Sequence, residues 1–216
     1  EGGSFPVELC MDDDLDVPEI QGEPEQVAVA KCNAAFVLAG QTRAVLTEDS
    51  SLGFCALRGL PGVYIRSFYH KLGNQGLVNL LQAFENKNAI VECIFCYREP
   101  GANGVHVFRG FTRGDIVPPR GDKGFAWDSI FQSWGEKRTF GELQGYEKRK
   151  VSPRAHALQV FKRFILGGKQ LDFPPDKGYY KFVVDDVSDT RVEKICNHKY
   201  MLKQGMEEKE EEEEEE

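Results

Sequence analysis

Apolar residues near the start of the chain recur at helical spacing. Between residues 23 and 40 they lie three or four positions apart, at Val27, Ala30, Ala34 and Leu38. This spacing places them on one face of a helix, and Gly40 follows the last of them as a common helix stop. We therefore expect a helix from Glu23 to about Gly40.

Shorter apolar runs that are rich in β-branched and aromatic residues predict strands. AVLTED (44–49) predicts a short buried strand that ends on two adjacent acids, NAIVECIFCYREP (88–100) a central strand, and GVHVFRGFTRGDIVP (104–118) one or two more. The turn signal PGANG joins the last two runs without an intervening helix, so these strands should pair antiparallel.

Two further segments have helical periodicity. One apolar face lies within 75–85, at Leu77, Leu80, Leu81 and Phe84, and another within 154–166, at Ala155, Leu158, Phe161 and Ile165. Helices and strands in this order indicate an α/β protein with a mixed sheet flanked by helices. Residues 169–204 contain one expected strand, YYKFVVDD, and we interpret them as a C-terminal extension of a main domain at 1–168.

The net charge of -8 comes from the C-terminal end of the chain. The last ten residues, EEKEEEEEEE, hold nine Glu and one Lys, and the rest has 26 acidic and 26 basic residues. Such a tail has no apolar surface to bury, so we expect residues 205–216 to be disordered. An arm that binds basic partners is the alternative. The neutral body lacks the basic face of nucleic-acid-binding proteins, so we expect no nucleic-acid partner.

Six cysteines, at 10, 32, 55, 93, 96 and 196, are scattered through apolar segments, which is typical of buried free thiols in a reducing compartment. Cys93 and Cys96 lie three apart on an expected strand and should face opposite sides, which argues against a metal or redox pair. No run reaches the about 18 apolar residues of a membrane-spanning helix, and no signal-peptide pattern is present. We expect a cytoplasmic protein without a membrane partner.

Glu48 and Asp49 are the first candidates for chemistry. Two neighbouring carboxylates raise each other's pKa unless a cation compensates, and Mg²⁺ prefers such oxygen ligands. Adjacent strand residues point to opposite sides, so only one of the two need face a site. A solvated acidic pair at a strand end is the alternative interpretation.

Two later segments could bind a base and an anion. In GDKGFAWDSIF (121–131), Phe125 or Trp127 could stack on a planar ring while Asp128 accepts hydrogen bonds from its edge. In YEKRKVSPRAHA (146–157), Lys148 and Arg154 flank a helix start that would suit an anion or a polar base edge. A turn with core aromatic residues and a solvated basic turn are the respective alternatives.

Taken in order, these clusters resemble a known family. PEIQGEP, KC, EDSSL, GLPGVYIR, GFAWDSIF, TFGEL and EKRKVSPRAHAL resemble, from about Phe5 to Ile165, the eukaryotic form of the inosine triphosphate pyrophosphatase family. The resemblance implies an elongated mixed α/β domain with a nucleotide cleft between two lobes, usually as a homodimer. It also implies hydrolysis of ITP, dITP and XTP to the monophosphate and pyrophosphate, which sanitises the nucleotide pool, with Mg²⁺ or alternatively Mn²⁺.

The resemblance also implies roles for individual residues. The metal ligands would be Glu19 and Asp49, with Glu48 beside Asp49, and Asp49 would orient or deprotonate the attacking water. The implied substrate-binding residues are Lys31, Asp49, Ser50 and Arg66 for the phosphates, Phe125, Ala126, Trp127 and Asp128 for the base and ribose, and Lys148 and Arg154 for the purine 6-oxo group.

The chain departs from the family's pattern in two main places. The phosphate-cradling signature Ser/Thr-x-Asn-x-x-Lys does not occur in the 216 residues, so we expect that the family's N-terminal segment is lacking before Glu1. Pro153 stands where the family has a base-contacting His, and Ala126 and Ser129 replace a Gly and a Pro. A degenerate member that binds nucleotides without catalysis is therefore the alternative function.

Overall fold

The computed structural model describes residues 10–11, 17–167 and 179–184 of the chain. Its helices are α1 (Pro24–Leu38), α2 (Ile65–Leu80), α3 (Gly145–Val151) and α4 (Pro153–Ile165), with short 3₁₀ turns η1 (Cys55–Leu57) and η2 (Ala126–Ile130). Its strands are β1 (Val45–Phe54), β2 (Pro61–Gly62), β3 (Asn88–Arg98), β4 (Val105–Ile116), β5 (Phe131–Ser133) and β6 (Tyr179–Val184).

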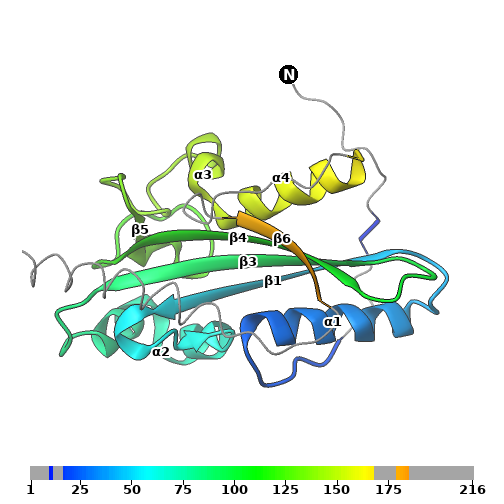
Figure 1. Cartoon of the computed structure of the whole chain (residues 1–216). Coiled ribbons are helices and arrows are strands. Elements are labelled where there is room, and N and C mark those ends of the chain that lie inside the picture. Colours follow the sequence, from blue (N-terminus) through cyan, green and yellow to red (C-terminus); the bar gives the residue numbers. More distant parts are fainter. Residues whose placement is uncertain (1–9, 12–16, 168–178, 185–216) are drawn as a thin grey trace, which may run out of the picture.

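One sheet forms the centre of the molecule. The strand order is β2-β1-β3-β4-β5, β6 also pairs with β4, and every pair is antiparallel. The long strands β1, β3 and β4 run side by side (Figure 1). Helix α1 packs on one face of these strands and α4 on the other. Helix α2 packs on Leu52, Phe54 and Val91, which lie on the α4 side by strand alternation. The predicted α/β class with a helix-flanked sheet is confirmed, as is the antiparallel β3–β4 pair. The nucleotide cleft between two lobes stays a prediction.

Strand β1 corrects one expectation. The two acids do not end a short strand, because β1 continues for five residues past Asp49 to Phe54. Its whole length pairs with β3, with Glu48 opposite Phe95 and Asp49 opposite Ile94. The small residues Ser50 and Ser51 fit within the ladder, and the buried Leu52 and Phe54 then anchor the end of the strand. The acids therefore lie in mid-strand.

The buried side of α1 also differs from the expected one. The helix has the expected bounds, but Leu38 is 55% exposed, whereas Ala28, Cys32 and Ala35 are buried. Small residues line this face because α1 packs closely on β3 and β4, where Ile94, Cys96 and Val107 lie beneath it. A spacing of three or four residues fits several neighbouring faces of a helix, so periodicity alone did not choose the correct one.

Helix α2 begins ten residues before the expected segment, at Ile65, and Gly73 interrupts its helical geometry with φ 62°. Of its expected face, Leu77 and Leu81 are buried, whereas Phe84 lies beyond the helix and is 40% exposed. The first half of α2 carries polar residues on several sides, which is why the apolar pattern missed it. The helix at 154–166 is confirmed as α4, whose Phe161 packs on Phe108 of β4.

The described cysteines are all free thiols. Cys32, Cys93 and Cys96 are buried as expected, but Cys10 is exposed. Cys93 packs in the core under α4 and Cys96 in the core under α1, which confirms that they face opposite sides of the sheet. Cys196 lies outside the described residues.

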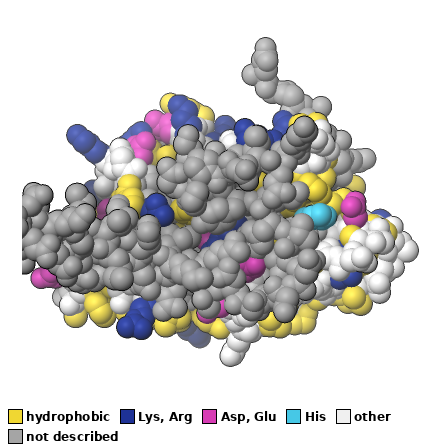
Figure 2. Space-filling view, viewed as in Figure 1, with side chains coloured by type: hydrophobic (Ala, Val, Ile, Leu, Met, Phe, Trp, Pro, Cys, Tyr) yellow, Lys and Arg dark blue, Asp and Glu magenta, His cyan; other side chains and the backbone are white. Residues whose placement is uncertain are grey.

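The expected strand at 179–186 is confirmed as β6, which joins the main sheet along Val105–Gly110 of β4. The other C-terminal predictions are an extension at 169–204 and a disordered tail at 205–216. They concern residues that lie mostly outside the described part of the chain, so they stay predictions. None of the described helices is both long and apolar enough to cross a bilayer. Where side chains are coloured in Figure 2, cationic and acidic groups are interspersed over this face.

Candidate active site

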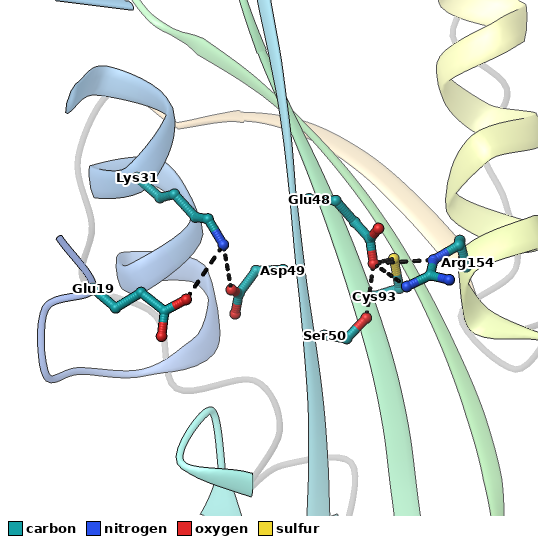
Figure 3. Close-up of polar contacts among 7 residues, drawn as sticks. All are labelled: Glu19, Lys31, Glu48, Asp49, Ser50, Cys93 and Arg154. Carbon is teal, nitrogen blue, oxygen red and sulfur yellow. Dashed lines mark hydrogen bonds and ion pairs between the residues drawn. The ribbon is translucent and has the colours of Figure 1, made fainter. Parts of the chain in front are cut away.

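Asp49 lies on the α1 side of the sheet, where it forms an ion pair with Lys31. The ammonium of Lys31 on α1 is 3.2 Å from Oδ1 of Asp49 and 3.5 Å from Oε1 of Glu19. Glu19 belongs to the loop that leads into α1, so three segments of the chain meet here (Figure 3). The structure thus brings together three of the residues expected to bind metal and phosphate.

Burial sets the acidity of Asp49. Its side chain is only 13% exposed, and desolvation raises the pKa of the carboxyl above its ordinary value, while the nearby Lys31 opposes the rise. Glu19 and Glu48 raise this pKa further because like charges disfavour ionisation. A raised pKa makes the Asp49 carboxylate a stronger proton acceptor than a solvated aspartate.

Glu19 and Asp49 suit a divalent cation. The ammonium of Lys31 is shared by two carboxylates, so a positive charge between Glu19 and Asp49 is already favourable. Mg²⁺ binds through one or two carboxylates and completes its shell with waters and phosphate oxygens. The donor set fits such an ion, although the described residues contain no group of three or more His, Cys, Asp or Glu arranged around a metal position.

Glu48 points to the other side of the sheet, toward α4. Its Oε1 accepts hydrogen bonds from Nε and Nη2 of Arg154 at 3.1 and 2.8 Å, from Ser50 Oγ at 2.9 Å and from Cys93 Sγ at 3.4 Å. Figure 3 shows the two groups of contacts on opposite sides of β1. The structure therefore does not bring Glu48 to the carboxylates of Glu19 and Asp49, so its expected metal role stays a prediction that this placement does not favour.

The aromatic segment forms the 3₁₀ turn η2 and the residue before it. The rings of Phe125 and Trp127 meet edge to face at 6.2 Å, with Phe125 72% exposed and Trp127 buried. Asp128 accepts a hydrogen bond from the backbone N–H of Phe125 and forms an ion pair with Lys148 on α3. This arrangement offers one exposed ring for stacking and, beside it, a fixed carboxylate and ammonium for a polar edge.

Two residues that were expected to bind substrate, Arg66 and Ala126, make fewer side-chain contacts with the rest of the candidate site. Arg66 lies in the first turn of α2 and is exposed, and no contact joins it to the other candidate residues within the described part of the chain. Ala126 adopts a left-handed conformation, with φ 48°, at the start of η2. That conformation is costly for a residue with a side chain, which explains why a glycine would suit this position better.

Sequence reasoning missed Asn74 on α2. Its Nδ2 donates hydrogen bonds to the carbonyl of Ala126 at 3.1 Å and to Oγ of Ser129 at 2.8 Å. These contacts join residues more than fifty positions apart, and no local motif signals such a partnership. The replacement of the family's Pro by Ser129 was the one available hint, because a serine adds a hydrogen-bonding group.

The sheet lies between helices. Carboxylates and a lysine lie on one side of it, and an aromatic turn with polar neighbours lies on the other. This arrangement is that of an α/β protein whose candidate site suits a nucleoside phosphate. The chain belongs to the Ham1 family, whose model matches residues 5–164. It is 43% identical to an inosine triphosphate pyrophosphatase of Mycosarcoma maydis over 76% of this chain and 83% of that protein.

Solved structures agree with this assignment. A Ham1 protein of Staphylococcus aureus aligns with a TM-score of 0.65 at 28% identity, covering 71% of this chain and 82% of that one. A nucleoside-triphosphatase or dITP/XTP pyrophosphatase of Mycobacterium abscessus aligns with a TM-score of 0.58 at 28% identity, covering 69% and 82%. The predicted family is therefore confirmed.

Proposed function

We propose that this protein hydrolyses ITP, dITP and XTP to the nucleoside monophosphate and pyrophosphate, and so removes non-canonical purines from the nucleotide pool. The observation that carries the proposal is the grouping of Glu19, Lys31 and Asp49 on one side of β1, in a chain of the Ham1 family. The names of the related proteins supply the substrate class.

Each residue of the first group has a chemical task. Asp49 orients a water molecule and accepts its proton as the water oxygen attacks the α-phosphorus, and the bond to the bridging oxygen of pyrophosphate breaks. Lys31 binds the phosphate oxygens and neutralises the charge that develops on the leaving group. Glu19 and Asp49 would hold Mg²⁺, with Mn²⁺ as an alternative, and such an ion lowers the pKa of a bound water and screens phosphate charge.

The second group of residues recognises the base. Phe125 stacks on the purine ring, Asp128 binds a polar edge of the nucleoside, and Lys148 and Arg154 donate to the 6-oxo oxygen. ATP carries an amino group at this position, so two donors would face a third and adenine is rejected. The remaining expected substrate-binding residues are Ser50, Arg66, Ala126 and Trp127, of which only Arg66 is exposed.

The proposal is tested by incubating the natural full-length protein with Mg²⁺ and ITP, dITP, XTP or ATP, and by measuring pyrophosphate and orthophosphate separately. Pyrophosphate from the first three, with much slower release from ATP, is the expected result. No turnover of ITP, or release of orthophosphate alone, would overturn the proposal.

We further propose that the protein acts in the cytoplasm as a homodimer. The free cysteines support a reducing compartment, and the family resemblance supports the dimer. Sedimentation at micromolar concentration would show a species of twice the 24.4 kDa chain mass, whereas a monomer at all concentrations would contradict the assembly.

A further inference from the structure

Among the candidate residues, Glu48 accepts the largest number of hydrogen bonds. A single oxygen, Oε1, receives hydrogen bonds from two nitrogens of Arg154, from Ser50 and from Cys93. These donors come from α4, β1 and β3, so three elements converge on one carboxylate (Figure 3). A group held from three directions keeps a fixed orientation, and it fixes the orientation of the group that it binds.

Arg154 is held at its backbone as well as at its side chain. It follows Pro153, the first residue of α4, and the start of this helix lies against β4 at Gly110. A Cβ at Gly110 would come 2.1 Å from the carbonyl oxygen of Pro153, so only a glycine permits this approach. The Cα of Arg154 therefore has a defined position above the sheet, and Glu48 defines where its guanidinium points.

The bond to Glu48 leaves part of the guanidinium for a ligand. Glu48 engages Nε and Nη2, so the N–H groups of Nη1 are not used by this carboxylate. The side chain of Arg154 is 59% exposed, which makes these donors accessible from solvent. Burial lowers the pKa of Arg154, but the hydrogen bonds and the charge of Glu48 outweigh this effect and leave the pKa raised.

We propose that Glu48 is a specificity-determining positioning residue, which orients Arg154 so that the N–H groups not bound to Glu48 meet the 6-oxo oxygen of the purine. The proposal rests on the proposed function and adds the residue that makes base discrimination possible. Correct orientation of Arg154 matters more in this chain because Pro153 can supply no side-chain donor beside it. Lys148 is held in the same manner by Asp128, so each of the two base-reading cations has its own carboxylate.

The experiment compares the wild-type chain with Glu48→Gln, using initial rates for ITP and ATP and a titration with Mg²⁺. Glutamine preserves the shape but removes the charge that attracts Arg154. We expect the ratio of kcat/KM for ITP to that for ATP to fall about tenfold, mainly through KM for ITP. The Mg²⁺ concentration for half-maximal rate stays unchanged, because Glu48 lies on the side of β1 opposite Asp49.

The control is Glu85→Gln, which neutralises an exposed glutamate of the loop after α2 and should leave the ratio unchanged. If Glu48→Gln does not fold by circular dichroism, Glu48→Asp replaces it, since it keeps the charge but is one methylene too short to hold Arg154 in place. A higher Mg²⁺ requirement with unchanged base selectivity would make Glu48 a metal ligand and overturn the inference, as would no change in either quantity.

A double-mutant cycle separates positioning from a merely structural role. Arg154→Lys should lower the selectivity ratio by a similar factor, and the variant with both substitutions should lose no more than either alone, because Glu48 acts through Arg154. If the double variant instead lost selectivity by the product of the two single-variant factors, the inference would be contradicted.

A wild-type chain that does not hydrolyse ITP would refute the proposed function but would still allow a test of the inference. The dissociation constants of IMP and AMP are then measured by tryptophan fluorescence. A preference for IMP in the wild type that disappears in Glu48→Gln supports the role of Glu48, whereas an absent or unchanged preference overturns it.

Discussion

At the scale of single residues, Asp49 and Glu48 show how two neighbours in a strand acquire different tasks. The alternation of side chains along β1 sends Asp49 toward Lys31 and Glu48 toward Arg154. The sequence predicts this divergence from the strand assignment alone. It does not predict the partner of Glu48, because Arg154 lies 106 positions away and no local pattern joins them.

Asp49→Asn should abolish turnover without weakening the fold. Loss of the group that accepts the proton should lower kcat by about 10²–10⁴-fold, as for other general bases. Burial raises the pKa of Asp49 above its unfolded value, so the folded protein binds this proton more tightly than the unfolded chain. The stabilisation from that proton is present at low pH and is lost as pH rises through the folded pKa. At pH 7 the neutral Asn should therefore equal or exceed the wild type in melting temperature, and a clear loss of Tm would contradict this account.

The pH profile provides a second test of Asp49. Activity requires the ionised form of Asp49, so kcat/KM should rise with pH to a plateau. Lys31 lowers the pKa of Asp49, so Lys31→Met should move the midpoint to higher pH in addition to reducing the rate. A midpoint that stays in place in Lys31→Met would show that another group governs the profile.

At the scale of elements, the long strands were predictable and the irregular segments were not. A continuous run such as NAIVECIFCY has few conformations other than a buried strand, and β3 is confirmed with nearly the expected bounds. The first half of α2 has no comparable apolar stripe, and the turn η2 depends on a left-handed Ala126. Such features are stabilised by tertiary contacts, which a local pattern does not contain.

The contact between α2 and η2 leads to a prediction about Asn74. Asn74→Ala would remove both hydrogen bonds to η2, and the turn would lose the support that holds Ala126 in its strained conformation. We expect KM for ITP to rise several-fold with a smaller change in kcat, and the fluorescence of Trp127 to shift toward that of a more solvated indole. Each lost hydrogen bond is worth about 1 kcal/mol.

A matched variant shows whether the effect of Asn74 depends on Ser129. Ser129→Ala removes one acceptor and should reproduce part of the rise in KM, and it should add little to Asn74→Ala because both changes break the same contact. If the effects of the two substitutions on KM were fully additive, Asn74 and Ser129 would not act through the same contact.

The contact between α4 and β4 predicts a large loss of stability in Gly110→Ala. The new methyl group would overlap the carbonyl of Pro153 and the backbone of Ala157, both from α4. The helix start must then move, at a cost of about 2 kcal/mol or more in the free energy of unfolding. Gly145→Ala is the control, because a Cβ there meets nothing within 4 Å. Equal denaturant midpoints for the two variants would be inconsistent with the described packing.

At the scale of the whole molecule, the candidate site consists of two halves on opposite sides of β1. Within the described residues, β1 has β3 on one side and only the two-residue β2, at Leu52 and Gly53, on the other. Glu48 and Asp49 thus lie where β1 is the outermost described strand. A triphosphate near Lys31 and a base near Arg154 belong to one ligand only if that ligand passes around this edge. This arrangement could not be predicted from the sequence, because strand order is a property of the whole sheet and not of any one segment.

Two fragments of the substrate would test whether the two sides of β1 bind their parts of the ligand independently. Pyrophosphate resembles the part of the substrate near Lys31, and IMP resembles the part near Arg154. A ligand at 100 times its dissociation constant stabilises the folded state by about 2.7 kcal/mol, which raises the melting temperature by several degrees. We expect Lys31→Met to lose the shift caused by pyrophosphate with Mg²⁺ and to keep the shift caused by IMP.

Arg154→Lys should show the opposite behaviour, because its guanidinium contributes only to the base half. Asp49→Asn, which binds without turnover, allows the same measurement with intact ITP, and its shift should exceed that of either fragment because one molecule then engages both halves. If Lys31→Met abolished the response to IMP as well, the two sides of β1 would not be separate subsites. The opposite placement of Glu48 and Asp49 would then have no functional meaning.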